Sequence, residues 1–156
     1  MRSQASLQAT AFLRMLRIGA TLRRELEARL LAALGLTVKD YEVLLTLARA
    51  ELGAMRRVDL AEQVLLSPSG VTRLLDGLER LGLVEKRECT TDARVTYAAI
   101  TDAGRRTAAD AEAQYEAVLP ELIGGSLTPT ELETLVDLLG RLPGAAEAGF
   151  CPLEPA

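Results

Sequence analysis

Hydrophobic residues recur at every third or fourth position through most of the chain, which is the spacing of amphipathic helices. From residue 7 to residue 33 this stripe predicts one long helix, and Gly35 is expected to end it. Thr37 is placed to cap a second helix, with Asp40 near the positive end of its dipole. The predicted buried stripe of this second helix consists of Tyr41, Leu44, Leu45 and Ala48.

The central part of the chain is predicted to form two helices joined by a tight turn. A connection over residues 51–56, with room for a short extended segment, leads into a short helix near 58–65. The side chains expected to be buried in that helix are Val58, Ala61, Val64 and Leu65. Ser67 is a suitable N-cap for the next helix and Pro68 fits its first turn, while Gly82 is expected to end it. The stripe predicted to be buried in this helix is Val71, Leu74, Leu75, Leu78 and Leu81.

After Gly82 the hydrophobic period changes from helical to alternating. Residues 84–88 and 95–100 are predicted as two strands, and the polar stretch 89–94 as the loop between them. Two helices, a tight turn and a hairpin in this order are typical of a winged helix-turn-helix. Such a unit is shaped to place one helix in a major groove of DNA and the hairpin tip in a minor groove.

Two further helices are predicted to close the chain. The first runs from Thr101 to about Ile123, where consecutive glycines interrupt it, and the second begins at Thr128. One side of the last helix is apolar and carries Leu132, Leu135, Val136 and Leu139. The fold class predicted is therefore mainly α with a small β-hairpin wing.

Composition supports a helical protein and argues against a membrane or exported one. Hydrophobic residues make up 49% of the 156 residues while aromatic residues make up only 3%, so the apolar content is mostly Leu, Ala and Val. No apolar run reaches the ~18 residues needed to cross a bilayer. Because Arg14 and Arg17 interrupt the apolar stretch near the N-terminus, no signal peptide is expected and the predicted location is cytoplasmic.

The net charge of -4 is unevenly distributed along the chain. Residues 107–156 carry one basic and nine acidic side chains, whereas residues 56–106 carry nine basic and eight acidic ones. Phosphates respond to local fields within about 8–10 Å, so an acidic C-terminal third does not exclude DNA binding. A central excess of one positive charge argues only against tight non-specific binding.

The residue inventory argues against an enzyme and against a metal cofactor. Without a histidine the chain cannot form a Ser/His/Asp or Cys/His set, and it contains no GxSxG motif and no phosphate-binding loop. Its two cysteines, Cys89 and Cys151, form neither a disulfide framework nor a CxxC pair. No cofactor is therefore expected.

The sequence resembles the MarR family of bacterial transcription regulators over roughly residues 7–142. The matching segments are LAEQVLLSPSGVTRLLDGLERLGLVEKR at 60–87, DAR at 92–94 and ITDAG at 100–104. The resemblance implies an obligate homodimer that binds a pseudo-palindromic double-stranded DNA operator, with one half-site for each subunit. The expected role of this protein is that of a repressor, and no membrane partner is expected.

The resemblance also implies a division of the chain into domains. Residues 1–35 and 102–142 would be dimerisation helices and residues 36–101 the DNA-binding unit, with 143–156 as a tail. The positions that match the DNA-facing part of the family's recognition helix are Ser67, Ser69, Thr72 and Arg73. The family's wing motif matches Asp92, which would brace the loop, and Arg94, which would enter the minor groove. Lys86 and Arg87, at the base of the hairpin, are candidate phosphate contacts.

A small aromatic or anionic ligand, held between the dimer helices and the winged unit, is a further implication of the resemblance. The residues expected to contact it are Arg14, Met15, Arg17, Ile18, Leu22, Tyr41 and Leu45, with one of the two arginines facing a carboxylate. For each of these residues, a role limited to the core or to a helix face remains the competing interpretation.

Two other functions remain open from the sequence. The near-neutral central region is compatible with a winged-helix module that contacts protein and does not bind DNA. Cys89 stands where the family usually has a polar wing residue, which leaves room for a thiol-based redox-sensing regulator. Another departure is Leu65, which stands where a turn glycine is common and leaves the tightness of that turn in question.

Overall fold

The computed structural model describes residues 3–88 and 95–143 of the chain. The helices are α1 (Gln4–Leu34), α2 (Val38–Arg49), α3 (Arg57–Gln63), α4 (Pro68–Arg80), α5 (Asp102–Leu119) and α6 (Pro129–Gly140). The strands are β1 (Ala54–Arg56), β2 (Val84–Glu88) and β3 (Thr96–Ile100), and the short helical turns are η1 (Glu51–Gly53) and η2 (Pro120–Gly124). None of the described helices is long and apolar enough to cross a membrane.

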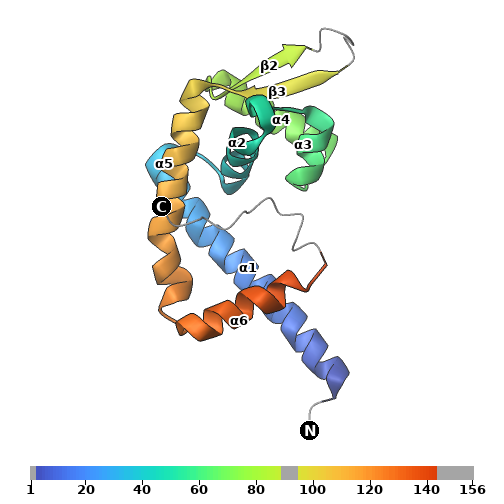
Figure 1. Cartoon of the computed structure of the whole chain (residues 1–156), viewed down its shortest axis with the longest axis vertical. Coiled ribbons are helices and arrows are strands. Elements are labelled where there is room, and N and C mark those ends of the chain that lie inside the picture. The colour runs from blue at the N-terminus through green and yellow to red at the C-terminus, as the bar shows by residue number, and fades with distance from the viewer. Residues whose placement is uncertain (1–2, 89–94, 144–156) are drawn as a thin grey trace.

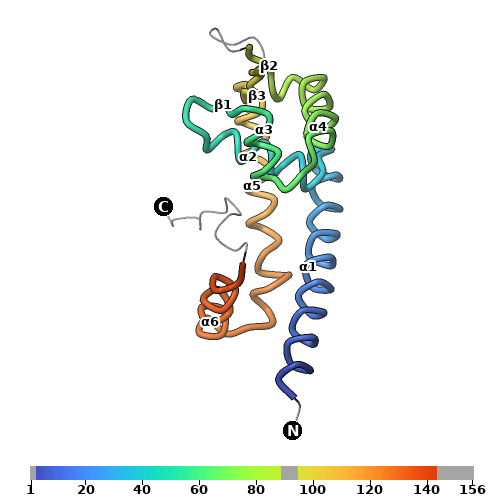
Figure 2. Tube along the Cα trace, turned by 90° about the vertical axis from the view of Figure 1, so that its right-hand side faces the viewer, coloured from blue at the N-terminus to red at the C-terminus, as the bar shows by residue number. Residues whose placement is uncertain are grey.

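The elements form a compact head on a helical stalk. Helices α2, α3 and α4 and the three strands lie together at one end, and α1 and α5 run away from them, in contact near the head and diverging beyond it (Figure 1). Figure 2 shows α6 on the side of α5 that is away from α1. The fold is therefore mainly helical with a small sheet, and the predicted fold class is confirmed.

Helix starts follow the capping chemistry of the sequence. Thr37 and Asp40 form a reciprocal capping box at the start of α2, with the Asp40 carboxylate 2.8 Å from the backbone nitrogen of Thr37. Ser67 accepts the backbone N–H of Gly70 at 3.1 Å at the start of α4. Thr101 caps α5 in the same way. These caps satisfy backbone donors that would otherwise have no partner within the helix.

Helices α3 and α4 end in the same hydrogen-bonding motif but with different residues. After α4, Gly82 adopts a φ of 70°, and the N–H of Leu83 donates to the carbonyl of Leu78 at 3.0 Å. After α3, the N–H of Leu66 donates to Ala61 at 2.9 Å in the same pattern, and Leu65 takes the left-handed position with a φ of 52°. The turn is therefore tight, although a leucine in this conformation costs about 1–2 kcal/mol.

The sheet is antiparallel with the strand order β1-β3-β2. The predicted hairpin is confirmed, and β3 begins one residue later than the sequence pattern indicated. The extended segment expected within 51–56 is β1, which pairs with β3 through Met55 and Ala98. The sheet therefore has a third strand that fixes the hairpin to the helical head.

Two groups of buried side chains hold the molecule together. The larger group lies in the head and includes Leu44, Leu60, Val71, Leu75 and Ile100. The smaller group joins α1, α2 and α5 and includes Leu26, Leu30, Tyr41, Leu45 and Val118. The stalk is thus attached to the head by a hydrophobic contact of its own.

Three residues predicted to be buried are exposed. Val58 is 59% exposed because α3 begins at Arg57 and turns Leu60 inward in its place. Leu65 is 80% exposed because its left-handed conformation directs the side chain out of the turn. Leu81 is 63% exposed because it follows α4 as its C-terminal cap. In each case the residue lies at a helix end, where the 3.6-residue pattern no longer defines a buried face.

Large apolar side chains on α1 and α6 are exposed in the single chain. On α1 they are Leu7, Phe12, Leu13, Met15, Leu16, Ile18 and Leu31. On α6 and just beyond it they are Leu132, Leu135, Val136, Leu138, Leu139 and Leu142. No residue of α6 is buried. So many exposed large apolar side chains on two helices are typical of a protein interface.

Candidate nucleic-acid interface and adjoining cavity

Helix α4 has one apolar face and one polar face. Val71, Leu75 and Leu78 are buried in the head. Ser69, Thr72 and Arg73 are exposed on the other face, as the sequence predicted for the DNA-facing side. The Thr72 hydroxyl donates to the carbonyl of Pro68 at 2.9 Å, and the Ser67 and Ser69 hydroxyl oxygens are 3.2 Å apart. The first turn of the helix therefore presents short, ordered polar groups.

An ion pair between α3 and α4 holds one acidic side chain of this face. Arg57 Nη2 donates to Glu79 at 2.9 Å, and both side chains are partly buried. The Nε of Arg57 is buried without a hydrogen-bond partner in the described part of the chain. Arg73, Asp76 and Arg80 surround a shallow open hollow beside Glu79. With Glu79 paired to Arg57, the negative charge of this helix face is reduced close to Arg73 and Arg80.

The candidate phosphate contacts on β2 are exposed and paired with neighbouring acids. Arg87 lies 2.7 Å from Glu85, and Lys86 lies 3.8 Å from Glu88. Exposed pairs of this kind contribute about 0–1 kcal/mol, so a phosphate could compete for either cation. The wing residues Asp92 and Arg94, together with Cys89, lie outside the described residues.

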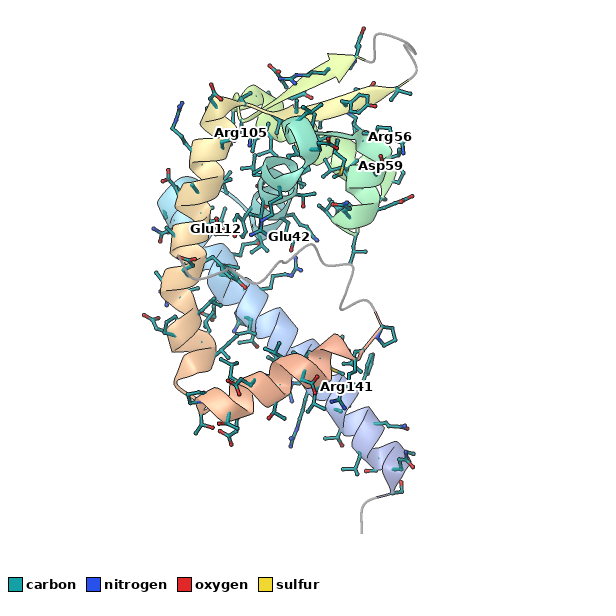
Figure 3. All side chains as sticks on the ribbon, viewed as in Figure 1. Glu42, Arg56, Asp59, Arg105, Glu112 and Arg141 are labelled. Carbon is teal, nitrogen blue, oxygen red and sulfur yellow. The ribbon has the colours of Figure 1, made fainter. Side chains whose placement is uncertain are left out.

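Two arginines strengthen the junction between strand β1 and its neighbours. Arg56 and Asp59 lie side by side (Figure 3), with Arg56 Nε 2.6 Å from the carboxylate, and this hydrogen bond raises the pKa of the guanidinium. Arg105 of α5 reaches back to donate to the carbonyl of Ala48 at 3.3 Å. Its guanidinium packs on Gly53, where a Cβ would lie 2.1 Å from Nη2. The Arg56–Asp59 pair joins β1 to α3, and the Arg105 contacts attach the stalk to the head beside β1.

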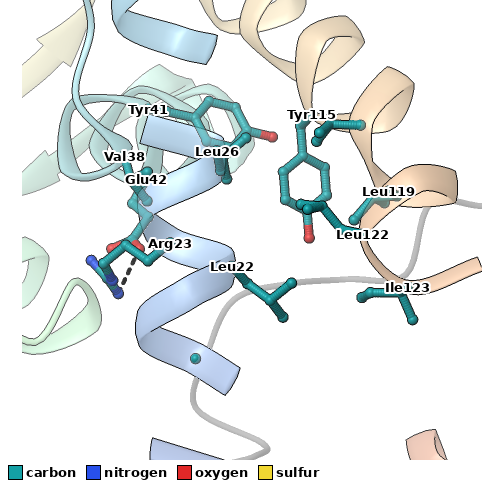
Figure 4. A pocket seen from close by; sticks show the side chains of 12 residues that line it. Leu22, Arg23, Leu26, Val38, Tyr41, Glu42, Tyr115, Leu119, Leu122 and Ile123 are labelled. Atoms are coloured by element: carbon teal, nitrogen blue, oxygen red, sulfur yellow. Dashed lines mark ion pairs between the residues drawn. The ribbon is translucent and has the colours of Figure 1, made fainter. Parts of the chain in front are cut away.

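A cavity of about 220 Å³ lies between α1, α2 and α5 (Figure 4). Its lining comprises Gly19, Leu22, Arg23, Leu26, Val38, Tyr41, Glu42, Tyr115, Val118, Leu119, Leu122 and Ile123. Most of these side chains are apolar. Arg23 and Glu42 add a charged pair with an N–O distance of 3.6 Å.

Two of the seven predicted ligand contacts, Leu22 and Tyr41, line this cavity. Leu45 is buried in the hydrophobic group next to it, and the other four are exposed along α1 outside it: Arg14, Met15, Arg17 and Ile18. The arginine that does line the cavity is Arg23, which the sequence reading did not select. The available signal was its position three residues before Leu26 and four residues after Gly19, which places all three on one side of the helix.

The contribution of α5 and of η2, which follows it, to the cavity was also missed by sequence reasoning. Tyr115, Val118, Leu119 and Leu122 recur at helical spacing, but the sequence did not indicate that this stripe packs against Tyr41. The two tyrosine rings have centroids 6.1 Å apart and are tilted by 32°. Burial, followed by the nearby Glu112 carboxylate, raises the pKa of Tyr41 to about 12. Burial also raises the pKa of Tyr115.

The helix–turn–helix of α3 and α4, followed by the β2–β3 hairpin, defines the chain as a winged helix-turn-helix protein. The sequence model of the MarR family matches residues 34–95, which include α2 to α4 and β2. Sco5413, a MarR family transcriptional regulator from Streptomyces coelicolor, is 30% identical, with 92% of this chain and 96% of that chain covered and a TM-score of 0.73. The chain belongs to the MarR family of transcriptional regulators, whose members are not enzymes.

Other similar proteins agree with this assignment. YdgJ, an uncharacterized HTH-type transcriptional regulator of Bacillus subtilis, is 29% identical over 111 residues, which are 71% of this chain and 66% of that protein. Sco3205, a MarR family regulator from Streptomyces coelicolor whose structure was solved in complex with DNA, is 22% identical. Its TM-score is 0.77, and 89% of this chain and 87% of that chain are covered. At this identity the likeness supports the fold alone.

Proposed function

We propose that this chain is a homodimeric, sequence-specific DNA-binding regulator that represses transcription and is released from its operator by a small ligand. Helix α4 would enter the major groove of each half-site of a pseudo-palindrome, and the tip of the β2–β3 wing would enter the minor groove. The observation that carries the proposal is the division of α4 into a buried apolar face and an exposed face that bears Thr72 and Arg73. Sco3205, which has the same fold, was solved with DNA.

Each exposed side chain has a defined chemistry toward DNA. Arg73 can donate two hydrogen bonds to the O6 and N7 of a guanine, a contact worth about 1–3 kcal/mol of discrimination. Ser67, Ser69 and Thr72 offer hydroxyls for phosphates or base edges near the N-terminus of α4, where the helix dipole favours anions. Arg87 and Lys86 would exchange their neighbouring acids for phosphates.

The proposed partner for the exposed apolar faces of α1 and α6 is a second copy of the chain. These side chains are 37–65% exposed in the described part of the chain, and α6 and most of α1 lie at the end of the molecule away from the winged unit (Figure 2). A twofold pairing through these helices would carry two copies of α4 at a fixed separation. Half-sites one helical turn apart, about 10 bp, require such a fixed separation. Residues 1–35 and 102–142 would accordingly form the dimerisation region.

The α1–α2–α5 cavity is the proposed site for a small aromatic or anionic ligand. Its apolar walls and its two tyrosine rings suit an aromatic ring, and Arg23 can face a carboxylate or phenolate. Because the cavity lies between the stalk and the head, a ligand there would change the angle between them. A small change in the separation of the two α4 helices would weaken both half-site contacts together.

The proposal is tested by selecting DNA from a random duplex library with the purified full chain, followed by a salt titration on the selected sequence. The expected result is an enriched motif with twofold symmetry and an affinity that falls steeply with salt, since several phosphates are contacted. Failure to retain any duplex would support the alternative of a module that contacts protein. Enrichment of a single asymmetric half-site would contradict the dimeric arrangement.

The ligand site is tested separately by titrating 2-hydroxybenzoate, an anionic phenol, and following thermal unfolding. Gly19→Leu is the matched variant, because a Cβ at Gly19 meets no atom within 4 Å and the larger side chain would fill the cavity. We expect the probe to raise the Tm of the wild-type protein and to leave the variant unchanged. An equal rise in both proteins would place the binding elsewhere.

A further inference from the structure

A continuous set of polar contacts leads from the cavity to the turn that precedes α4. Arg23 of α1 lies 3.6 Å from one carboxylate oxygen of Glu42, and both residues line the cavity (Figure 4). The other oxygen of Glu42 accepts a hydrogen bond from Lys39 of α2. Lys39 Nζ also donates to the backbone carbonyl of Val64 at 2.8 Å. The set thus runs across α1, α2 and the end of α3.

The carbonyl that Lys39 contacts belongs to a turn with an unfavourable backbone conformation. Val64 is the C-terminal cap of α3, where backbone carbonyls lack helical partners and carry partial negative charge. The next residue is Leu65, whose φ of 52° is unfavourable for a leucine and whose side chain is 80% exposed, so packing of that side chain does not hold it in place. Two residues further on, Ser67 caps α4. The ammonium of Lys39 therefore stabilises the segment that sets where α4 begins.

Glu42 is suited to connect this contact with the cavity. Its two carboxylate oxygens are divided between Arg23 and Lys39, so Arg23 orients the carboxylate that in turn positions the ammonium. The Lys39 and Glu42 side chains are about a quarter exposed, at 27% and 26%, and less screened by solvent than a surface pair. A ligand that draws Arg23 toward itself would loosen Glu42 and, through it, Lys39.

We propose that Lys39 is a positioning residue for the recognition helix, and that Glu42 transmits the state of the cavity to it through Arg23. This inference rests on the proposed DNA-binding function, since the positioning of α4 matters only if α4 reads DNA. It assigns to the chain a specific route by which a ligand would change the operator affinity.

The experiment is a set of double-mutant cycles on the duplex selected by the wild-type protein. Lys39→Met and Arg23→Met are made singly and together, first with Glu42 present and then in a Glu42→Gln background. Arg24→Met is the matched control, because Arg24 lies on the same helix and forms an ion pair of the same 3.6 Å length with Glu25, apart from the cavity. Lys39→Arg tests rescue by a residue that keeps the charge and the donor.

With Glu42 present, Lys39→Met is expected to weaken DNA binding about fivefold, because a charged hydrogen bond to the turn is lost. Arg23→Met should weaken binding about twofold alone and have no further effect once Lys39 is replaced. In the Glu42→Gln background the Arg23 effect should disappear. Lys39→Arg should restore most of the affinity, and Arg24→Met should match the wild type. Additive effects of Arg23 and Lys39 with Glu42 present would overturn the proposed transmission.

A second measurement without DNA separates this inference from the proposed function. Amide hydrogen exchange of the folded protein should be faster at Leu65 and Leu66 in Lys39→Met, while the centre of α4 keeps its protection. Unchanged exchange at the turn would overturn the positioning role even if the wild-type protein binds DNA. If the wild-type protein binds no duplex, the proposed function fails, and the expected change in exchange would then show only a structural contact.

Discussion

The rings of Tyr41 and Tyr115 lie with their centroids 6.1 Å apart and tilted by 32°, and they join the head of the molecule to its stalk. Tyr41 belongs to α2, which packs under the winged unit, while Tyr115 belongs to α5, which leaves it. Both rings line the cavity. A ligand in the cavity would therefore touch the contact that holds the two parts at their present angle.

The buried phenol of Tyr41 should make the protein less stable at high pH. Its pKa is raised from 10.0 to about 12, so between these values the unfolded chain loses this proton while the folded chain retains it. The free energy of unfolding should consequently fall as pH rises above 10, with a contribution from Tyr41 on the order of 2 kcal/mol by pH 12. Denaturant unfolding of the wild type and of Tyr41→Phe between pH 9 and 12 measures it. The difference between their free energies of unfolding should change across this range. A constant difference would contradict a raised pKa of Tyr41 in the folded protein.

Gly104 is expected to tolerate no side chain. A Cβ at this position would lie 2.0 Å from the carbonyl oxygen of Leu83 and 2.8 Å from Cγ1 of Ile100, because the first turn of α5 passes directly over the start of the sheet. Gly104→Ala should lower the free energy of unfolding by about 3 kcal/mol or more, since the backbone oxygen cannot move aside cheaply.

Gly77→Ala in α4 is the control for Gly104→Ala. The nearest atom to its Cβ is the end of the Arg80 side chain at 4.0 Å, so the same substitution should stabilise the helix by about 0.5–1 kcal/mol. Chemical denaturation of the two variants tests the pair. Equal effects of the two alanines would mean that helix propensity alone matters at both positions.

The turn before α4 offers a stabilising substitution. Leu65→Gly removes the cost of a left-handed leucine, about 1–2 kcal/mol, and adds about 0.5–1 kcal/mol of chain entropy to be lost on folding. The net expectation is a gain of about 0.5–1 kcal/mol in the free energy of unfolding. Leu65→Ala keeps a Cβ and therefore the strain, so thermal unfolding should separate the two variants. A gain that is equal in both would point to the loss of an exposed apolar side chain.

Capping residues and period changes explain why so much of the fold could be predicted. Thr37, Ser67 and Thr101 each place a helix start correctly, and the change to alternation after Gly82 locates the hairpin. These signals are local, because they depend on residues within one turn of each other. The prediction of burial was wrong at Val58, Leu65 and Leu81, where a helix end changes the direction of the side chain.

The cavity could be predicted only in part because it depends on contacts between distant segments. Leu22 and Tyr41 were selected from the apolar stripes of the first two helices, but the crossing of α1 and α5 decides which residues of α1 face inward. That crossing places Arg23, and not Arg14 or Arg17, beside the cavity. The polar face of α4 was easier to predict, because a helix with a clear apolar stripe has only one face left for solvent.

Arg73 should contribute sequence preference as well as affinity. Its side chain is exposed on α4 next to Thr72, and bidentate contact with a guanine predicts that Arg73→Ala costs about 1–3 kcal/mol on the selected duplex and less on random duplex. Competition binding on both DNAs measures the two losses. Arg24→Ala, an exposed arginine on α1, should leave the ratio unchanged. Equal losses on selected and random DNA for Arg73→Ala would reduce Arg73 to a phosphate contact.

A charge on the apolar face of α6 should separate the proposed dimer. Val136 is 65% exposed in the single chain, and burying an unpaired carboxylate there in a twofold interface is unfavourable. Val136→Asp should weaken dimerisation at least about tenfold, as measured by sedimentation. A loss of about 1.4 kcal/mol in the free energy of association is already a factor of ten, and a twofold interface contains the substituted residue twice. Val58→Asp is the control, since Val58 is 59% exposed on α3, away from both stalk faces, and should leave the dimer intact.

Because half-sites are bound in pairs, Val136→Asp should also lose affinity for the full palindrome while keeping the affinity for a single half-site. A Val136→Asp protein that remains dimeric would exclude α6 from the interface and, with it, the proposed spacing of the two recognition helices.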